Sequence, residues 1–276
     1  MTDCNSCPSK NSCNIEEQNT CGIKNNSNNQ VKNIIGVMSG KGGVGKSTVS
    51  AMIAEELNKK GFKVGIMDAD ITGPSIPRLL NISHKKATAN ELGIIPVTTS
   101  NGIKVMSLNL LMEDEDQPVI WRGPLIAGVV EQFWTDVQWG DLDYLIIDMP
   151  PGTGDVALTV MQSIPISGLV MVSVPQDLVS MIVSKSINMA KKLNIPILGV
   201  VENMSYVKCP DCGKKIRIFE SENTIKFLKE NNLELLGELP MSKNIANVSV
   251  EGNDIIEEEI QNTFEQIGTK IIKSLS

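Results

Sequence analysis

The sequence predicts an α/β fold built on a mostly parallel sheet with helices on both faces. Two observations predict it. From Val31 to the C-terminus, short runs of apolar and β-branched residues alternate with stretches of helical periodicity. The runs are apolar throughout, as in strands that are covered on both sides, and they do not alternate with polar residues.

The first elements follow from this pattern. Val31–Met38 is a β-rich apolar run, and residues 48–60 have a helical pattern directly after a glycine-rich loop. Phe62–Met67 is a second apolar run. Residues 93–111 read as extended chain with a turn at Asn101-Gly102, a dipeptide typical of hairpins.

The second half of the chain continues the alternation. Strands are predicted at residues 144–147, 168–174, 197–201 and 233–239, and helices at residues 125–137, 156–161, 177–193 and 254–275. The last helix carries apolar residues at steps of three and four, which predicts one buried face. Its polar face opens with Glu257, Glu258 and Glu259 in place of lysines, which disfavours a membrane-binding helix.

Residues 1–30 lie outside the pattern and contain too little apolar material to form a core. They end in Asn25–Gln30, a run of polar residues typical of flexible linkers. We therefore expect a flexible, disordered, cysteine-rich segment over residues 1–30 and one domain over residues 31–276.

Composition narrows the functional classes. The chain has 276 residues, 41% of them hydrophobic, which suffices for one large domain. A formal charge of −7 disfavours a nucleic-acid surface. No apolar run approaches the roughly 20 residues that span a bilayer, and the polar start shows no secretory signal. We expect a cytoplasmic protein with neither nucleic acid nor membrane as a partner.

The glycine-rich loop predicts an ATP and Mg²⁺ site. Gly40, Gly45, Lys46 and Ser47 match the G-x-x-x-x-G-K-[ST] phosphate-binding pattern, between a predicted strand and a predicted helix. In this pattern backbone N–H groups and the lysine bind phosphates, and the Ser47 hydroxyl binds Mg²⁺. The expected nucleotide-binding residues of the loop are Gly40, Lys41, Gly42, Gly43, Val44, Gly45, Lys46, Ser47 and Thr48.

Acidic residues follow two other strands, at the sheet edge where ligands of open α/β folds bind. Asp68 and Asp70 follow the second strand, and Asp148 ends the strand at 144–147. We expect Asp148 to hold Mg²⁺ through water and Asp70 to orient or deprotonate the attacking water. Asp155 is expected as a helix cap or as a switch residue.

Two features raise the question of a second chain. Lys41 is not required by the phosphate-binding pattern, and its residue type fits charge stabilisation in cis, in trans, or plain solvent exposure. Cys209-Pro-Asp-Cys212-Gly213, in a hairpin predicted over residues 205–218, supplies two thiolates, half of a Zn²⁺ or [4Fe–4S] site. The missing ligands come from the N-terminal segment, from small molecules, or from the same cysteines of a second chain.

Lys41–Thr48 resembles the deviant phosphate loop of the SIMIBI class of P-loop ATPases, which includes ParA, MinD, nitrogenase iron protein and the Mrp-type iron–sulfur carriers. That resemblance implies a homodimer in which Lys41 reaches the ATP of the partner. It also implies that Asp70 and Asp148 are the two switch aspartates.

Within this class the chain resembles the Mrp-type ATP-binding iron–sulfur cluster carriers. The similar segments, which together cover most of residues 33–240, are Ile120–Pro124, Trp139–Tyr144, Asp148–Asp155, Pro175–Asp177 and Glu202–Tyr206, followed by Cys209–Gly213. The resemblance implies a [4Fe–4S] cluster bridged by Cys209 and Cys212 of two protomers and delivered to apo iron–sulfur proteins. It further implies slow ATP hydrolysis, and contacts of Asn203 and the Pro240 backbone with adenine.

The N-terminal cysteines suggest a second metal site. Cys4, Cys7 and Cys13 resemble the C-x2-C-P-x4-C part of a cluster motif in eukaryotic-type relatives, which place their fourth cysteine upstream. Here the fourth candidate, Cys21, lies downstream. The segment therefore holds a second cluster, a zinc ion, or unligated thiols.

Three other functions fit parts of the pattern. A Zn-bridged regulatory ATPase would use the same cysteines, because thiolates alone do not distinguish zinc from iron. A ParA/MinD-like positioning ATPase would need a basic face or a cationic terminal helix, which the sequence does not show. A nitrogenase-reductase-like electron donor usually takes single cysteines from two separate loops.

Overall fold

The computed structural model describes residues 26–112, 123–178, 181–217, 221–242 and 258–276. The four N-terminal cysteines lie outside these ranges, as do residues 120–122 of the segment Ile120–Pro124 that resembles the Mrp-type carriers. No helix within the described ranges is long and apolar enough to cross a lipid bilayer.

A single nine-stranded sheet organises the described chain, in the order β10-β9-β8-β1-β7-β2-β6-β5 with β11 beside β9. Its strands are β1 (Gln30–Ser39), β2 (Val64–Asp68), β5 (Val97–Thr98), β6 (Lys104–Met106), β7 (Asp141–Asp148), β8 (Gly168–Ser173), β9 (Ile197–Lys208), β10 (Lys215–Ile216) and β11 (Leu235–Pro240). Neighbouring strands are parallel except for β5 with β6 and β10 with β9. A separate hairpin consists of β3 (Thr88–Asn90) and β4 (Gly93–Ile95).

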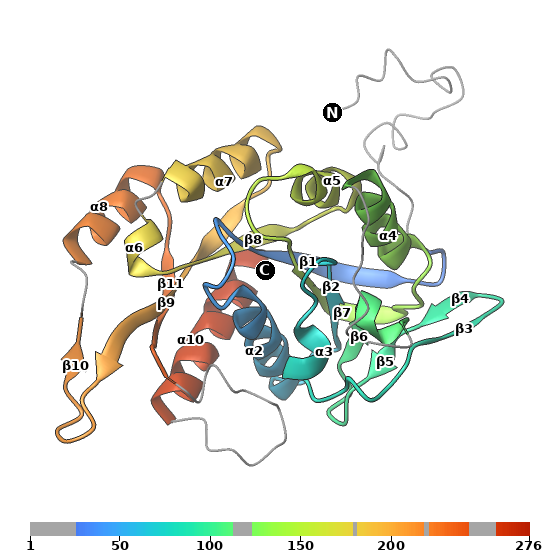
Figure 1. Ribbon diagram of the computed structural model, residues 1–276, viewed down its shortest axis with the longest axis horizontal. Helices are drawn as coiled ribbons and strands as arrows, with labels where there is room; N and C mark the ends of the chain where they lie inside the picture. The colour runs from blue at the N-terminus through green and yellow to red at the C-terminus, as the bar shows by residue number, and fades with distance from the viewer. Residues whose placement is uncertain (1–25, 113–122, 179–180, 218–220, 243–257) are drawn as a thin grey trace.

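Helices cover both faces of the sheet (Figure 1). They are α2 (Lys46–Lys59), α3 (Ile76–Leu79), α4 (Gly123–Thr135), α5 (Asp155–Ser163), α6 (Pro175–Leu178), α7 (Met181–Lys192), α8 (Ser221–Asn231) and α10 (Glu258–Leu275), with a 3₁₀ turn η2 at Leu108–Leu110. Helices α2, α3 and α10 belong to one buried apolar cluster, and α4, α5 and α7 to the other. The predicted fold class is confirmed.

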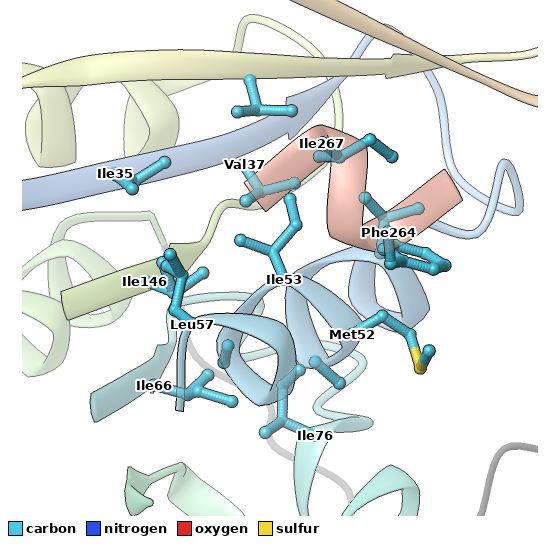
Figure 2. Packing of buried hydrophobic residues seen from close by; sticks show 14 of the residues in the cluster. Ile35, Val37, Met52, Ile53, Leu57, Ile66, Ile76, Ile146, Phe264 and Ile267 are labelled. Carbon is cyan, nitrogen blue, oxygen red and sulfur yellow. The ribbon is translucent and has the colours of Figure 1, made fainter. Parts of the chain in front are cut away.

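The packing of α2 and α10 shows why the apolar patterns specify this arrangement. Ile53 and Leu57 of α2 pack against Ile35 of β1 and Ile146 of β7, and all four are fully buried (Figure 2). On α10 the predicted buried face is confirmed at Ile260, Phe264, Ile267 and Ile271. Burying one such side chain contributes about 1.5–3 kcal/mol, so these contacts hold both helices on the sheet.

The expected boundaries agree with the structure for most elements, but α3 and β3 were not predicted, and Leu108–Leu110, expected as extended chain, form the 3₁₀ turn η2. Strand β9 continues to Lys208, seven residues past the predicted end at Val201, because its polar second half pairs with β11 and β10. The helix predicted over residues 177–193 corresponds to α6 and α7, and residues 179–180 between them lie outside the described ranges. Helix α8 was not predicted, since its short polar pattern resembles a loop.

The described chain begins with a segment attached to the sheet. The Asn29 side-chain amide donates to the Val137 carbonyl (2.8 Å), and its oxygen accepts the Gly140 N–H (2.8 Å). The Gln30 N–H donates to the Gly140 carbonyl (2.9 Å). These bonds fix the start of β1 at the edge of the sheet opposite to the phosphate loop.

Gly199 allows β9 to lie against β11, and its substitution should destabilise the fold. It sits beside a register shift between β8 and β9 with φ of 153°, and an added Cβ would lie 2.6 Å from the Glu234 carbonyl oxygen. That carbonyl accepts the Val200 N–H (2.8 Å). We expect Gly199→Ala to lower the free energy of unfolding by about 1–3 kcal/mol in urea titrations.

Gly128→Ala is the matched control, because Gly128 lies inside α4 and an added Cβ would meet no atom within 4 Å. Replacing a helical glycine should stabilise by roughly 0.5–1 kcal/mol. Equal effects of the two substitutions would contradict the proposed close contact of β9 with β11.

Candidate functional site

The phosphate loop lies between β1 and α2, as the sequence predicts. Gly43 and Gly45 adopt left-handed backbone angles, with φ of 80° and 84°. Gly45 is the N-cap of α2 and supplies no side chain to its first N–H groups, so the helix N-terminus is open toward the loop. Open N–H groups and the helix dipole together favour binding of a phosphate.

Asp148 is the buried centre of the site. It ends β7 level with Val37 of β1, and its side chain is fully buried. Its Oδ1 accepts from Lys46 Nζ (2.8 Å) and Ser50 Oγ (2.7 Å), and its Oδ2 accepts from Ser47 Oγ (2.6 Å). The carboxylate therefore holds the two residues expected to bind phosphate and Mg²⁺.

Asp68 and Asp70 have different environments. Asp68 is fully buried and accepts from the N–H of Asp70 (3.2 Å), the N–H of Ile76 (3.3 Å) and the Ser107 hydroxyl (3.2 Å), so it positions the loop that carries Asp70. Burial, and next the charge of Asp148, raise the pKa of Asp68 to about 8. Burial also raises the pKa of Asp70, which lies 3.7 Å from Lys46 Nζ.

The loop after β7 contacts the phosphate loop. The Gly152 N–H donates to the Ser39 carbonyl (2.8 Å), and Gly152 has φ of 81°, which favours glycine. Asp155 occupies the first turn of α5, where the N-cap is Gly154. The expectation that Asp155 caps this helix is therefore wrong, because the helix begins one residue earlier than the cap role requires.

A pocket of about 510 Å³ opens beside these groups and has the size of a small-ligand site. It is lined by most of the predicted nucleotide residues and by others from α3, from the ends of β1, β9 and β11 and from the loops after β2 and β7: Ser39, Gly42, Gly43, Gly45, Lys46, Ser47, Thr48, Asp70, Gly73, Ser75, Leu79, Pro151, Asn203, Met204, Pro240, Met241 and Ser242. The structure thus brings Asn203 and Pro240, distant in sequence, to the wall of the pocket that carries the phosphate loop.

Asn203 also supports the phosphate loop itself. Its side chain is buried, and its amide donates to the Val44 carbonyl (2.9 Å). Lys41 has a different place: it is exposed and lines a smaller neighbouring cavity of about 190 Å³ with Gln176, Tyr206 and Met241.

Residues Cys209–Gly213, which we call the cysteine knuckle, follow directly after β9. The Gly213 N–H donates to the Cys209 carbonyl (2.9 Å), and the Cys209 N–H donates to the Lys214 carbonyl (3.0 Å), which closes a tight turn. Backbone N–H groups of Cys212 and Asp211 bond to the Cys209 sulfur and lower the pKa of its thiol. Such N–H groups stabilise the thiolate form that binds metals.

Cys209 and Cys212 alone would supply only part of the ligands of a metal site. Cys209 is half-buried and Cys212 is exposed. Across the described ranges, no group of three or more His, Cys, Asp or Glu side chains is arranged to hold a metal ion. The two sulfurs therefore fit a site that is completed by ligands from elsewhere.

Among the residues that bond to Asp148, the sequence analysis missed Ser50. Ser50 lies one helical turn after Lys46, so both face Asp148, and its hydroxyl is fully buried. The i, i+4 spacing from a phosphate-loop lysine was the available signal.

The chain resembles known proteins along most of its length. Residues 30–276 match the model of the ParA family described as NUBPL iron-transfer P-loop NTPase. An iron–sulfur cluster carrier protein of Clostridium perfringens is 54% identical over 210 residues, 74% of each chain.

Two solved structures are similar in fold. A nucleotide-binding protein from Archaeoglobus fulgidus in complex with ADP shares 42% identity, with a TM-score of 0.71 over 83% of this chain and 92% of that one. The Aquifex aeolicus cell division protein MinD has a TM-score of 0.60 at 18% identity, over 87% of this chain and 97% of that one. At that identity the likeness shows the fold alone.

Ser50 should tune the Mg²⁺ site without contributing a ligand. Removing its hydroxyl leaves Asp148 Oδ1 with Lys46 alone, and loss of such a supporting bond typically weakens metal affinity about 10–100-fold. We expect Ser50→Ala to raise the Mg²⁺ concentration for half-maximal ATP hydrolysis by about tenfold, with little change in ADP affinity without Mg²⁺.

Ser274→Ala is the control, because Ser274 Oγ bonds to the carbonyl four residues earlier (2.9 Å), as Ser50 Oγ does (3.0 Å), but lies in α10. An unchanged Mg²⁺ dependence in Ser50→Ala would show that the Asp148 carboxylate is held well enough without it.

Proposed function

The chain belongs to the family of NUBPL-type iron-transfer P-loop NTPases, and from this premise we propose that it is a homodimeric, ATP-hydrolysing iron–sulfur cluster carrier. The cluster would be bound between the protomers by Cys209 and Cys212 of each, and passed to apo iron–sulfur proteins. We further propose that the protein acts in the cytoplasm and that it uses neither nucleic acid nor membrane as a partner.

One observation carries the proposal: Cys209 and Cys212 lie in one turn and provide half the number of thiols that a tetrathiolate site needs. Its two sulfurs are accessible, and backbone N–H groups favour the thiolate of Cys209. A [4Fe–4S] cluster takes four cysteine ligands. A two-fold axis through the knuckle would supply Cys209 and Cys212 twice, so a dimer completes the site with no further residue.

The geometry of β1 disfavours completion of the site by Cys21 of the same chain. Cys21 lies five positions before Asn26, which allows a reach of at most about 18 Å. Asn29 is fixed at the start of β1, whose ten residues span about 30 Å before the phosphate loop is reached. Since Cys209 lies beyond that edge, Cys21 falls short of it, and we propose that Cys21 instead joins Cys4, Cys7 and Cys13 in a separate second site.

The pocket supports nucleotide turnover. Lys46 lies where it can exchange its carboxylate partners Asp148 and Asp70 for phosphate oxygens, and Ser47 is already oriented by Asp148. Bound Mg²⁺ would neutralise charge that develops on the phosphates. Asp70 lines the pocket, and burial raises its pKa, which makes it a stronger base for the attacking water. We expect slow turnover, as befits a switch.

Cluster binding is tested in a background without the N-terminal cysteines. We expect Cys4, Cys7, Cys13 and Cys21→Ala protein to bind about four iron and four sulfide per dimer after anaerobic reconstitution. Adding Cys209→Ala and Cys212→Ala should remove both and lower the dimer fraction in gel filtration. Retained iron and sulfide would refute the bridging site, whereas zinc without sulfide would indicate a Zn-bridged ATPase.

The trans role of Lys41 is tested by mixing two inactive variants. Lys41→Ala and Asp70→Ala should each lose ATP hydrolysis but keep ATP binding. In a mixed dimer, the Lys41→Ala chain retains Asp70 and receives Lys41 from its partner. Random mixing should restore about a quarter of wild-type hydrolysis, since half the dimers are mixed and one of their two sites works. No recovery would assign Lys41 to its own site.

A further inference from the structure

Strand β9 connects the nucleotide pocket to the cysteine knuckle. Asn203 and Met204 line the pocket, and the same strand ends at Lys208, directly before Cys209. Figure 1 shows the β9–β10 hairpin projecting from the sheet on the side of α10. An isolated two-stranded hairpin is marginally stable in water, so its direction depends on what holds its base.

Tyr206 lies at that base and contacts three parts of the molecule. Its side chain is only 2% exposed. Its carbonyl accepts the N–H of Met241, a pocket residue (2.8 Å), and its hydroxyl donates to Glu259 Oε1 (3.1 Å). The Lys215 ammonium lies 4.3 Å from the centre of its ring. Tyr206 thus contacts the pocket wall, α10 and the return strand of the hairpin.

Glu259 bonds to both strands of the hairpin. Its carboxylate accepts from Lys215 (2.6 Å) on one strand and Lys208 (3.2 Å) on the other. These two lysines face each other in the β9–β10 register, and like charges in that position repel. Glu259 offsets the repulsion, and its bonds to Lys215 and then Lys208 lower its pKa to about 2.

Helix α10 gives Glu259 a fixed support. Its residues Phe264, Ile267 and Ile271 are buried in the cluster shared with α2, the helix that begins at the phosphate loop. Gly268 allows close contact, since an added Cβ would lie 2.9 Å from Glu56 of α2. A shift of the pocket wall relative to α10 would therefore change the contacts of Tyr206 and Glu259.

We propose that Tyr206 and Glu259 are positioning residues that couple occupancy of the nucleotide pocket to the position of the cysteine knuckle. The Met241 segment forms the pocket wall and bonds to Tyr206. A nucleotide that contacts this wall shifts the position of Tyr206. The contacts of Glu259 with Lys208 and Lys215 then change the position of the hairpin and of Cys209. This inference rests on the proposed function for its purpose, but its test needs no cluster.

The test measures thiol alkylation in the reduced, metal-free full chain. Iodoacetamide labelling of Cys209 and Cys212 is followed by mass spectrometry, without nucleotide and with saturating Mg-ADP. In the wild type we expect Mg-ADP to change the Cys209 rate about fivefold or more, the usual size of coupling between two sites. In Tyr206→Phe, which keeps the ring, and Glu259→Gln, which keeps the size, the ratio should approach one.

Two controls separate positioning from folding. Both variants should bind ADP within about twofold of wild type, because neither Tyr206 nor Glu259 lines the nucleotide pocket. Glu234→Gln should keep the wild-type ratio, because it removes another ion pair to α10, that with Lys270 (3.2 Å), away from the hairpin. An ADP-independent rate in the wild type, wild-type ratios in either variant, or joint loss of ADP affinity would each overturn the proposal.

The outcome is independent of the cluster assay. If the knuckle binds no iron but alkylation responds to ADP through Tyr206 and Glu259, the proposed coupling is supported and the proposed binding of an iron–sulfur cluster is refuted. If iron binds between protomers but alkylation ignores ADP, the carrier function stands and the coupling is refuted.

Discussion

The structure depends most on a single buried charge, the carboxylate of Asp148. A fully buried carboxylate is stable only when its oxygens are paired, and removing one partner of such a group typically costs 3–5 kcal/mol. Here the partners are Lys46, Ser47 and Ser50, all from the first residues of α2. The charge at the end of β7 therefore fastens α2 to the sheet and preorganises the phosphate loop.

The same edge of the sheet shows how parallel strands assemble a site from distant segments. β7 and β2 end level with each other and β1 ends two residues further on, since Val37 and Asp68 are both register partners of Asp148. Loops after these strands consequently converge, and Asp70 lies 3.7 Å from Lys46. Cys209 and Cys212 are connected to the sheet in a different way, because β9 extends past this edge and ends directly before Cys209. Its hairpin is held by carboxylates, with Glu238 bonded twice to Arg217 (2.8 Å each) and Glu259 to two lysines.

Local patterns made much of this predictable. The fold class follows from apolar runs that alternate with helical periodicity, and the phosphate loop from four residues whose chemistry is local. The length of β9 was not predictable, because Glu202, Asn203 and Ser205 are polar and buried only through the neighbours they meet. The bonds of Tyr206 with Met241 and Glu259 join residues 35 and 53 positions apart, and no periodicity encodes such pairs.

By itself the sequence determined that this protein has a phosphate loop, strand-end aspartates and two closely spaced cysteines. Each of these is a short motif whose backbone and side-chain chemistry is complete within a few residues. Only the tertiary structure decided that Asp68 supports the site from behind, that Ser50 completes the bonds of Asp148, and that Glu259 holds the hairpin. Those roles arise from burial and from contacts between distant segments, which exist only once the sheet and its helices have packed.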